Sequence, residues 1–310
     1  MTRTLERQVT PAEAGERLDR FLATAQADLS RSRVQALIRD GRAHVNGRAA
    51  VASRVLKPGD HVSLAIPDAP DAGRITPEEI PLRAVFEDED LLVIDKPAGL
   101  VVHPGAGIAS GTLVHALVHR LDKDTSGLMV VARTARAHRK LVEALRERRV
   151  KRVYDAIVWG DLRSGAGKIE GAIGRDPRQR SRMAVVPRGG KPAVTHWRAR
   201  ERYGPFTLLE VSLETGRTHQ IRVHFAHLRH PVLGDPVYGG RVKKLLSPSD
   251  AERSLAHDLL GGLSRQALHA SSLEFEHPVT GRLLEFHSPW PPDLAAAVNR
   301  LRLFLGRRRV

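Results

Sequence analysis

A single aspartate, Asp122, lies between basic residues immediately before an apolar run. In the string HRLDKDTSGL of residues 119–128, a small polar turn leads from this carboxylate toward the apolar residues 128–132. An aspartate with an ordinary pKa of about 3.9 is ionised at neutral pH, so it could act as a nucleophile or as a general base. A surface ion pair between Asp122 and Arg120 at a turn would give the same local pattern.

A second chemically rich string, ETGRTHQIRVH, occupies residues 214–224 and is predicted to run from a strand end into a helix. Arg217, Arg222 and the histidine His219 could bind phosphate, and Arg222 could instead pair with a carboxylate. A solvated cationic helix would explain the same residues without a ligand. The string alone leaves both interpretations open.

An aromatic residue, Tyr154, stands beside two basic residues in the string KRVYDA of residues 151–156. A ring in basic surroundings can stack on a nucleobase, although a core tyrosine would have the same neighbours. Histidines at positions 219, 224, 227 and 230 raise a zinc hypothesis, but the chain has no cysteine and no His-Glu-x-x-His spacing. We therefore expect no metal site.

The composition favours a nucleic-acid partner. The 310 residues carry a formal net charge of +15, and their hydrophobic content of 41% is that of an ordinary globular protein. An arginine-rich composition without a ligand is the alternative explanation of the charge. No run of 18 apolar residues predicts a membrane span, and the N-terminal residues lack the apolar run of a secretory signal, so we expect a cytoplasmic protein that does not enter membranes.

The elements that must position these side chains divide into two parts. Residues 12–67 predict a small α/β module with helices around residues 18–22 and 31–40, the second carrying Arg31 and Arg33. Residues 68–79, with three prolines, predict a linker. Residues 80–310 predict a second, larger domain.

The larger part predicts an α+β fold with a mixed, mainly antiparallel sheet, because short strand patterns alternate with few helices. A helix is predicted over residues 135–149, with Leu141, Val142 and Leu145 as its inner stripe. Apolar or β-branched runs predict the strands, at residues 91–95, 128–132, 153–158, 208–213, and a hairpin of 273–275 with 283–286.

Taken together, these strings resemble the RluA/RluD-type family of RNA pseudouridine synthases. The matching segments follow the family's order and span nearly all of residues 80–290; they are residues 92–104, 119–128, 152–156, 214–224 continuing into 230–239, and 268–270. Residues 12–67 resemble an RNA-binding module named after a small-ribosomal-subunit protein. The resemblance implies large-subunit ribosomal RNA as the substrate, and we expect the chain to act as a monomer.

The resemblance also implies a role for each matched residue. Asp122 corresponds to the catalytic aspartate, Arg222 to the arginine that ion-pairs with it, and Tyr154 to the aromatic residue against the target base. Arg120 corresponds to an arginine that enters the RNA helix in place of the extruded uridine. The remaining residues expected to contact RNA are His119, Arg217, His219, Arg31 and Arg33.

The reaction implied by this resemblance needs no metal and no nucleotide cofactor. Uridine loses its N-glycosidic bond, the base rotates while it is held, and a new bond forms through C5, with no redox change and no net hydrolysis. The carboxylate could attack C1′ of the sugar or C6 of the base, or it could remove the 2′ proton. The sequence does not choose among these three roles.

One departure from the family pattern keeps a second function open. Residues 111–117 run directly into Val118 and His119, where family members usually have a connector of about a dozen residues or more. A chain that lost activity with this connector would be a non-enzymatic RNA-binding or ribosome-assembly factor. A hydrolase using Asp122 and Asp124 as paired carboxylates is a weaker alternative.

Overall fold

The computed structural model describes residues 2–26, 31–67, 82–100, 118–241 and 249–307, and it divides the chain into two compact units, Met1–Pro77 and Glu78–Val310. The predicted linker at 68–79 and the shortened connector at 111–117 lie outside the described residues. No helix in the described part is both long and apolar enough to span a membrane.

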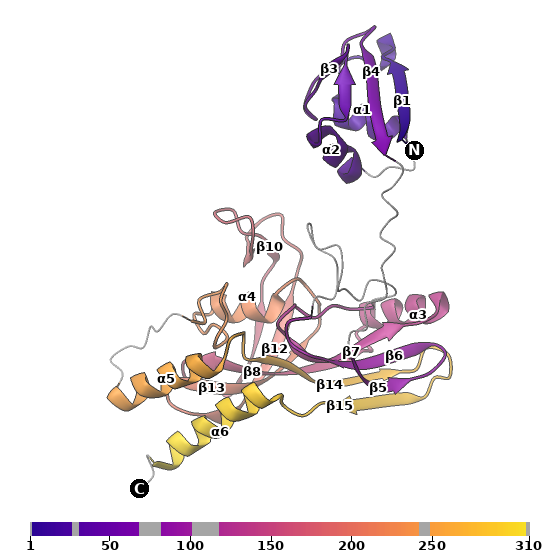
Figure 1. The fold of residues 1–310 in the computed structure, drawn as a ribbon. Helices are drawn as coiled ribbons and strands as arrows, with labels where there is room; N and C mark the ends of the chain where they lie inside the picture. The colour runs from indigo at the N-terminus through magenta and orange to yellow at the C-terminus, as the bar shows by residue number, and fades with distance from the viewer. Residues whose placement is uncertain (1, 27–30, 68–81, 101–117, 242–248, 308–310) are drawn as a thin grey trace. The chain divides into compact units, whose positions relative to one another are not determined.

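The N-terminal unit is a four-stranded sheet packed against two helices (Figure 1). Its apolar helix residues form the expected core, since Leu18, Phe21 and Leu37 are almost completely buried. One strand precedes residue 12, the predicted start of the module, and pairs antiparallel with the last strand of the unit. The elements in chain order are β1 (Thr2–Gln8), a 3-10 turn (Pro11–Glu13), α1 (Leu18–Ala25), α2 (Arg31–Arg39), β2 (Ala43–Val45), β3 (Arg48–Ala49) and β4 (His61–Pro67).

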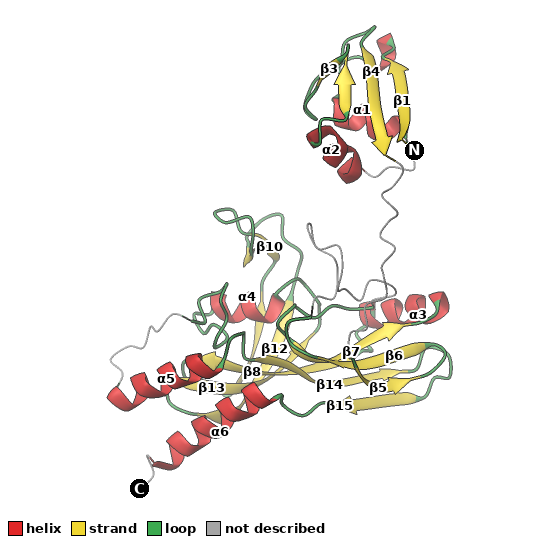
Figure 2. Cartoon of the chain, in the orientation of Figure 1, coloured by secondary structure: helices red, strands yellow, loops and turns green. Residues whose placement is uncertain are grey.

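A nine-stranded sheet forms the frame of the larger unit, and the α+β prediction is confirmed (Figure 2). Its strands follow the order β5-β6-β7-β14-β8-β13-β12-β9, with β15 also paired to β14. The strand bounds are β5 (Arg83–Glu87), β6 (Leu91–Lys96), β7 (Ser126–Ala132), β8 (Lys151–Trp159), β9 (Ala166–Glu170), β12 (Val194–Arg202), β13 (Phe206–Leu213), β14 (Leu268–Glu276) and β15 (Leu283–His287). The predicted hairpin is the antiparallel pair β14–β15.

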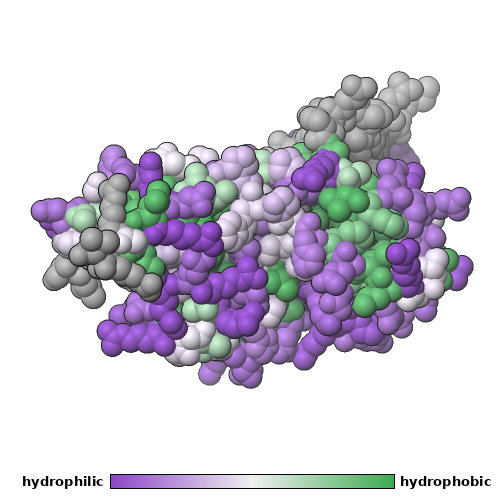
Figure 3. Space-filling model, turned by 90° about the horizontal axis from the view of Figure 1, so that it is seen from below, coloured by the Kyte–Doolittle hydropathy of each residue, from purple (hydrophilic) through white to green (hydrophobic). Residues whose placement is uncertain are grey.

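Helices and one small hairpin complete this unit. Figure 1 shows α3 and α4 on one face of the large sheet, with α6 passing over the other. Seen from the α6 side, the surface is mainly polar, and its apolar side chains gather toward one end (Figure 3). The remaining bounds are α3 (Ala135–Arg146), α4 (Gln220–His227), α5 (Asp250–Gly262), α6 (Pro292–Arg307) and the paired strands β10 (Ile173–Arg175) and β11 (Met183–Val185).

The inner stripe of α3 differs from the prediction. Ala137, Leu141 and Ala144 are buried, whereas Val142 and Leu145 are only half-buried. Positions 137, 141 and 144 follow the i, i+4, i+7 spacing of one helix face. The small alanines let this face approach the sheet closely, and the bulkier Val142 and Leu145 are left on the wall of a cavity described below.

A close contact between β7 and β14 fixes the start of β7, four residues after Asp122. Gly127 has φ +109° and pairs in parallel with Ala270, the one parallel contact among the described strands of the large sheet. A Cβ atom at Gly127 would lie 2.2 Å from the carbonyl oxygen of Ala270. Only glycine satisfies both the backbone angle and the spacing.

Gly127→Ala is therefore expected to lower the free energy of unfolding by about 3 kcal/mol or more, since it combines a left-handed backbone with overpacking. Chemical denaturation of both proteins measures the difference. The control is Gly189→Ala, where φ is +73° and nothing lies within 4 Å of the added atom; about 1–2 kcal/mol is expected there. Equal losses in the two variants would contradict the close-contact explanation.

Candidate active site

Asp122 lies in the loop that precedes β7, and two buried cations donate hydrogen bonds to the backbone of this loop. Lys96 donates a hydrogen bond from Nζ to the carbonyl of Lys123 at 2.9 Å, and Arg265 donates to the carbonyl of Asp124 at 3.0 Å. Burial is the main cause that lowers the pKa of Lys96 to about 8, and the charges of Asp124 and Asp122 oppose this effect. Sequence reasoning missed both cations, because lysine and arginine are rarely buried.

The carboxylate of Asp122 forms the ion pair that the sequence analysis expects. Its Oδ2 atom accepts a hydrogen bond from Nη1 of Arg222 at 3.0 Å, and its side chain is 19% exposed. Arg222 lies on the first turns of α4, and a hundred residues separate the two partners in sequence. This charge-assisted hydrogen bond fixes the orientation of the carboxylate.

Arg222 is shared with a second carboxylate that the sequence analysis did not single out. Asp235 is fully buried and accepts from Nε of Arg222 at 2.7 Å and from Nη2 at 2.9 Å. Burial works against the charge of Arg222, but the hydrogen bonds and charges of Asp235 and Asp122 outweigh it and raise the pKa. The backbone N–H groups of Val237 and Tyr238 hold Oδ1 of Asp235 in place.

His219 lies beside the catalytic candidate rather than on an open RNA-binding surface. Its Nε2 atom is 3.9 Å from Oδ1 of Asp122, and its Nδ1 atom shares a 2.7 Å hydrogen bond with the Tyr238 hydroxyl. Burial lowers the pKa of His219, although the charge of Asp122 opposes this shift. At neutral pH the ring is therefore uncharged, and Arg222 is the cation that balances Asp122.

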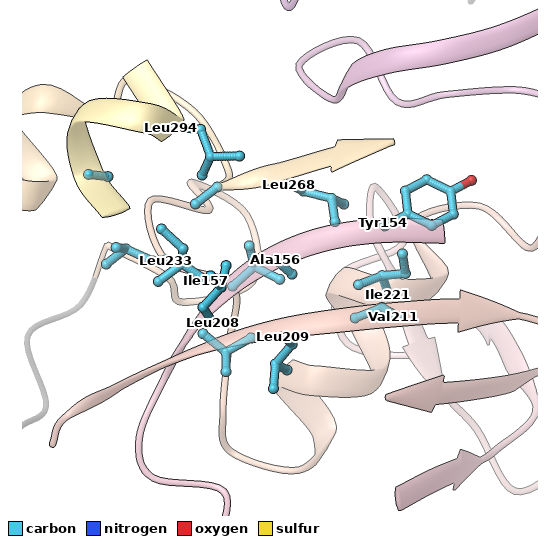
Figure 4. Close-up of a cluster of buried hydrophobic side chains, with 14 of the residues drawn as sticks. Tyr154, Ala156, Ile157, Leu208, Leu209, Val211, Ile221, Leu233, Leu268 and Leu294 are labelled. Carbon is cyan, nitrogen blue, oxygen red and sulfur yellow. The ribbon is translucent and has the colours of Figure 1, made fainter. Parts of the chain in front are cut away.

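Tyr154 is a core residue that also lines a cavity. Figure 4 shows its ring at the edge of the apolar cluster around Ala156, Ile221 and Leu268, with the hydroxyl pointing away from these side chains. The residue is 4% exposed. Burial is the main cause that raises the pKa of Tyr154, so the phenol is neutral and the ring offers an apolar edge to a ligand.

The cavity beside Tyr154 and Asp122 has a volume of about 600 Å³, within the range of small-molecule sites. Its wall is formed by the loop that contains Asp122, by strand β8, by helix α3 and by the start of α4. The lining side chains that matter below are Arg120, Asp122, Val142, Leu145, Arg152, Tyr154, Glu214, Arg217, His219 and Arg222. The cavity therefore brings together residues from four of the matched segments and the connecting helix.

The other residues expected to contact RNA have different surroundings. Arg120 and Arg217 both line the cavity. Arg120 is exposed and Arg217 is half-buried, and Nε of Arg217 donates to the carbonyl of Pro192 at 3.0 Å. Arg31 and Arg33 belong to α2, but their side chains lie outside the described part of the structure. Within the described ranges, no group of three or more histidine, aspartate or glutamate side chains could hold a metal ion.

His119 is a correction to the expected RNA contacts. Its ring is 8% exposed, and Nε2 accepts a hydrogen bond from the backbone N–H of Val130 at 3.2 Å. Burial, together with the charge of Arg152, lowers its pKa to about 3. A buried neutral imidazole cannot offer a cation to phosphate, so His119 ties the Asp122 loop to strand β7 instead.

The pKa of His119 gives the protein a defined loss of stability in acid. Below pH 6.5 the unfolded chain binds a proton at this ring, whereas the folded chain binds it only near pH 3. The free energy of unfolding is therefore expected to fall as the pH drops from about 6 to about 4, by up to about 1.4 kcal/mol per pH unit from this group.

Urea denaturation at several pH values measures this slope, and His119→Gln is expected to reduce it while an amide oxygen still accepts from Val130. His224 and His269, whose pKa values burial also lowers, leave a residual slope of the same sign in both proteins. An unchanged slope in His119→Gln would show that the ring is not the titrating group.

Comparisons with known proteins agree with this geometry. The family model described as RNA pseudouridylate synthase matches residues 90–227, and the S4 domain model matches residues 16–62. A relative from Vibrio parahaemolyticus, named ribosomal large subunit pseudouridine synthase D, is 45% identical over 96% of this chain and 94% of its own length. The relative of the same name from Xanthomonas campestris is 47% identical over 96% of this chain and 93% of its own.

Solved structures show the same fold. The human protein titled RNA Pseudouridylate Synthase Domain Containing 1 is 28% identical, with a TM-score of 0.53, over 71% of this chain and 94% of that chain. Human RNA Pseudouridylate Synthase Domain Containing 4 is 26% identical, with a TM-score of 0.52, over 71% and 93%. With its Asp122–Arg222 pair, its cavity and these relatives, the chain belongs to the RNA pseudouridylate synthase family.

Proposed function

We propose that this enzyme converts uridines of large-subunit ribosomal RNA into pseudouridine, with Asp122 as the catalytic residue. The observation that carries the proposal is the Asp122 carboxylate, held 3.0 Å from Arg222 in the cavity lined by Tyr154. The substrate class follows from relatives about 45% identical over 96% of this chain, which are named for the large ribosomal subunit.

In this proposal the target uridine leaves its helix and enters the cavity. Tyr154 contacts the base, and Arg120 occupies the space that the uridine leaves in the RNA helix. Taking a base out of its stack costs a few kcal/mol, which contacts of this kind offset. Arg217 and His219 extend the contact surface around the cavity mouth.

The reaction that follows rearranges bonds within one nucleotide. The C1′–N1 bond breaks, the base turns while it stays in the cavity, C1′ bonds to C5, and the hydrogen of C5 is replaced by one on N1. Asp122 acts as a nucleophile at C1′ or C6, or as a base at the 2′ carbon. In each case the hydrogen bond from Arg222 orients the carboxylate toward the substrate. The atoms and electrons balance without an added oxidant or reductant.

The N-terminal unit has its own role in the proposal. We propose that residues 12–67 bind RNA, with Arg31 and Arg33 among the contacts, because an S4 domain model matches residues 16–62. Residues 80–310 form the catalytic domain. We propose further that the chain acts as a monomer in the cytoplasm on ribosomal RNA.

The test is to incubate the full chain with transcripts of large-subunit ribosomal RNA, small-subunit ribosomal RNA and transfer RNA, and then to map pseudouridine at single-nucleotide resolution. Modification confined to defined uridines of the large-subunit transcript is the expected result. Modification of only the other two RNAs would overturn the substrate assignment. RNA binding without any modified uridine would favour a ribosome-assembly factor, and release of free uracil would favour a hydrolase.

A further inference from the structure

A buried arginine in the cavity, Arg152, has no counter-charge among the residues that the structure describes. It lies on β8, is 8% exposed, and its Nε atom has no hydrogen-bond partner. Across the described residues, no side chain forms an ion pair with its guanidinium. The two other buried arginines of this unit differ, because Arg222 binds Asp235 and Arg265 binds Asp293 at 2.7 Å.

An unpaired charge away from water is unfavourable for the folded protein. Natural proteins therefore pair buried cations or use them to bind a ligand. Arg152 has no structural partner to explain its position. The absence of one among the described residues points to an anion that arrives from outside the chain.

The position of Arg152 gives that anion a place. Arg152 and Tyr154 are two residues apart on one strand, so their side chains share a face of the sheet, and both line the cavity. Gly216 borders the guanidinium, since a Cβ atom there would lie 3.1 Å from Nη1 of Arg152. Glycine at this position leaves the guanidinium open toward the cavity.

The carboxylates of the cavity wall are already engaged elsewhere. Glu214 accepts from Arg148 at 2.6 Å through Oε2 and contacts His196 at 2.7 Å through Oε1. Asp122 is paired with Arg222 at 3.0 Å. Neither is an ion-pair partner of Arg152, so the cavity has an anionic carboxylate at one place and an uncompensated cation at another.

RNA supplies a matching anion. A nucleotide presents a neutral sugar and base to a catalytic carboxylate, and its flanking phosphates carry the negative charge. Guanidinium groups bind phosphate through paired, charge-assisted hydrogen bonds. We propose that Arg152 binds a phosphate adjoining the extruded uridine and so positions the sugar against Asp122. This inference rests on the proposed function, in which an RNA uridine enters this cavity.

The test couples a protein change to a backbone change. An RNA hairpin containing the target uridine is prepared with all its phosphates and with single methylphosphonates, which remove the charge, at positions on either side of that uridine. Fluorescence anisotropy then gives the affinity of wild type, Arg152→Gln and the control Arg163→Gln, which alters an exposed arginine on the loop after β8.

Arg152→Gln is expected to weaken binding of the unmodified hairpin by about 10- to 100-fold, the range of one or two charge-assisted hydrogen bonds. One methylphosphonate is expected to weaken binding to wild type similarly, yet to have little further effect on Arg152→Gln. Arg163→Gln is expected to leave affinity and the methylphosphonate effect unchanged. Additive losses at every methylphosphonate position would overturn the proposal.

Two further measurements separate phosphate binding from a structural role. Arg152→Met is expected to raise the melting temperature, because it removes an unpaired buried charge; a lower melting temperature, with equal affinity for all hairpins, would overturn the proposal. Arg152→Gln is expected to raise KM with a smaller change in kcat. A loss confined to kcat would indicate that Arg152 acts on the nucleobase and not on a phosphate.

Binding and isomerisation are measured separately, so the two proposals can fail independently. If wild type binds the hairpin without forming pseudouridine, the proposed function fails, while the coupling between Arg152 and the methylphosphonate remains measurable.

Discussion

Replacing Asp122 by asparagine or alanine is expected to reduce pseudouridine formation by at least about 1,000-fold. An amide cannot attack carbon as a nucleophile or take up a proton as a carboxylate does, and such a group contributes about 100- to 10,000-fold to a reaction. Single-turnover formation of pseudouridine in a substrate transcript measures the loss.

The fold is expected to survive these substitutions. Asp122 is partly exposed, and Arg222 keeps its two hydrogen bonds to Asp235 when Asp122 is changed. RNA affinity is therefore expected to stay within a few-fold of wild type.

Asp124→Asn is the matched control for Asp122→Asn, since it makes the same chemical change two residues along the same loop. The side chain of Asp124 is not part of the cavity lining. We expect Asp124→Asn to retain most activity. Similar activity in wild type and in Asp122→Asn would remove Asp122 from its assigned role.

The second large effect is expected from Asp235→Ala. This change leaves Arg222 buried with Asp122 as its remaining partner, and breaking a buried pair from one side costs about 3–5 kcal/mol. It also deprives the backbone N–H groups of Val237 and Tyr238 of their acceptor. Chemical denaturation is expected to show this loss of stability.

Activity is expected to fall as well, because Arg222 is no longer held in the orientation that aims Asp122. A displacement of about 1 Å at a reacting group can cost about 100-fold in rate. Asp235→Asn keeps an oxygen for the two backbone N–H groups but loses the charge, so it separates the two contributions. Its kcat is expected to fall while its stability loss is smaller than that of Asp235→Ala.

Asp161→Ala is the control for removal of a paired aspartate. Asp161 is 44% exposed and lies 3.4 Å from Arg202, and an exposed pair of this kind contributes about 0–1 kcal/mol. Equal destabilisation by Asp161→Ala and Asp235→Ala would show that the buried network around Arg222 contributes no more to the free energy of unfolding than an exposed ion pair.

Arg222 is shared between a buried carboxylate, Asp235, and a partly exposed one, Asp122. The fully buried Asp235 accepts hydrogen bonds from two nitrogen atoms of the guanidinium, Nε and Nη2. These bonds offset most of the free-energy cost of burying the cation. The third nitrogen atom, Nη1, donates to Asp122, which lines the cavity and whose side chain is 19% exposed. Asp235 therefore lies in the core, whereas Asp122 is partly exposed.

Much of this architecture could be predicted from the sequence. Strands such as β6, β7 and β13, the β14–β15 hairpin and the helix that carries Arg222 were expected, because alternation, apolar runs and turn residues act over a few neighbouring positions. Family resemblance assigned Asp122, Arg222 and Tyr154 together, and the structure brings all three to one cavity.

Other features depend on contacts between distant segments. The sequence did not reveal that Arg222 serves two carboxylates, that His119 is buried and neutral, or that Lys96 and Arg265 support the Asp122 loop. Nor did it reveal that Arg152 has no ion-pair partner in the described part of the chain. Each is a question of whether a charged side chain is buried and what faces it. Local sequence determines which groups are present and which element carries them, whereas the packing of segments a hundred residues apart decides their solvation and pairing, and these two quantities set the charge and reactivity of a site.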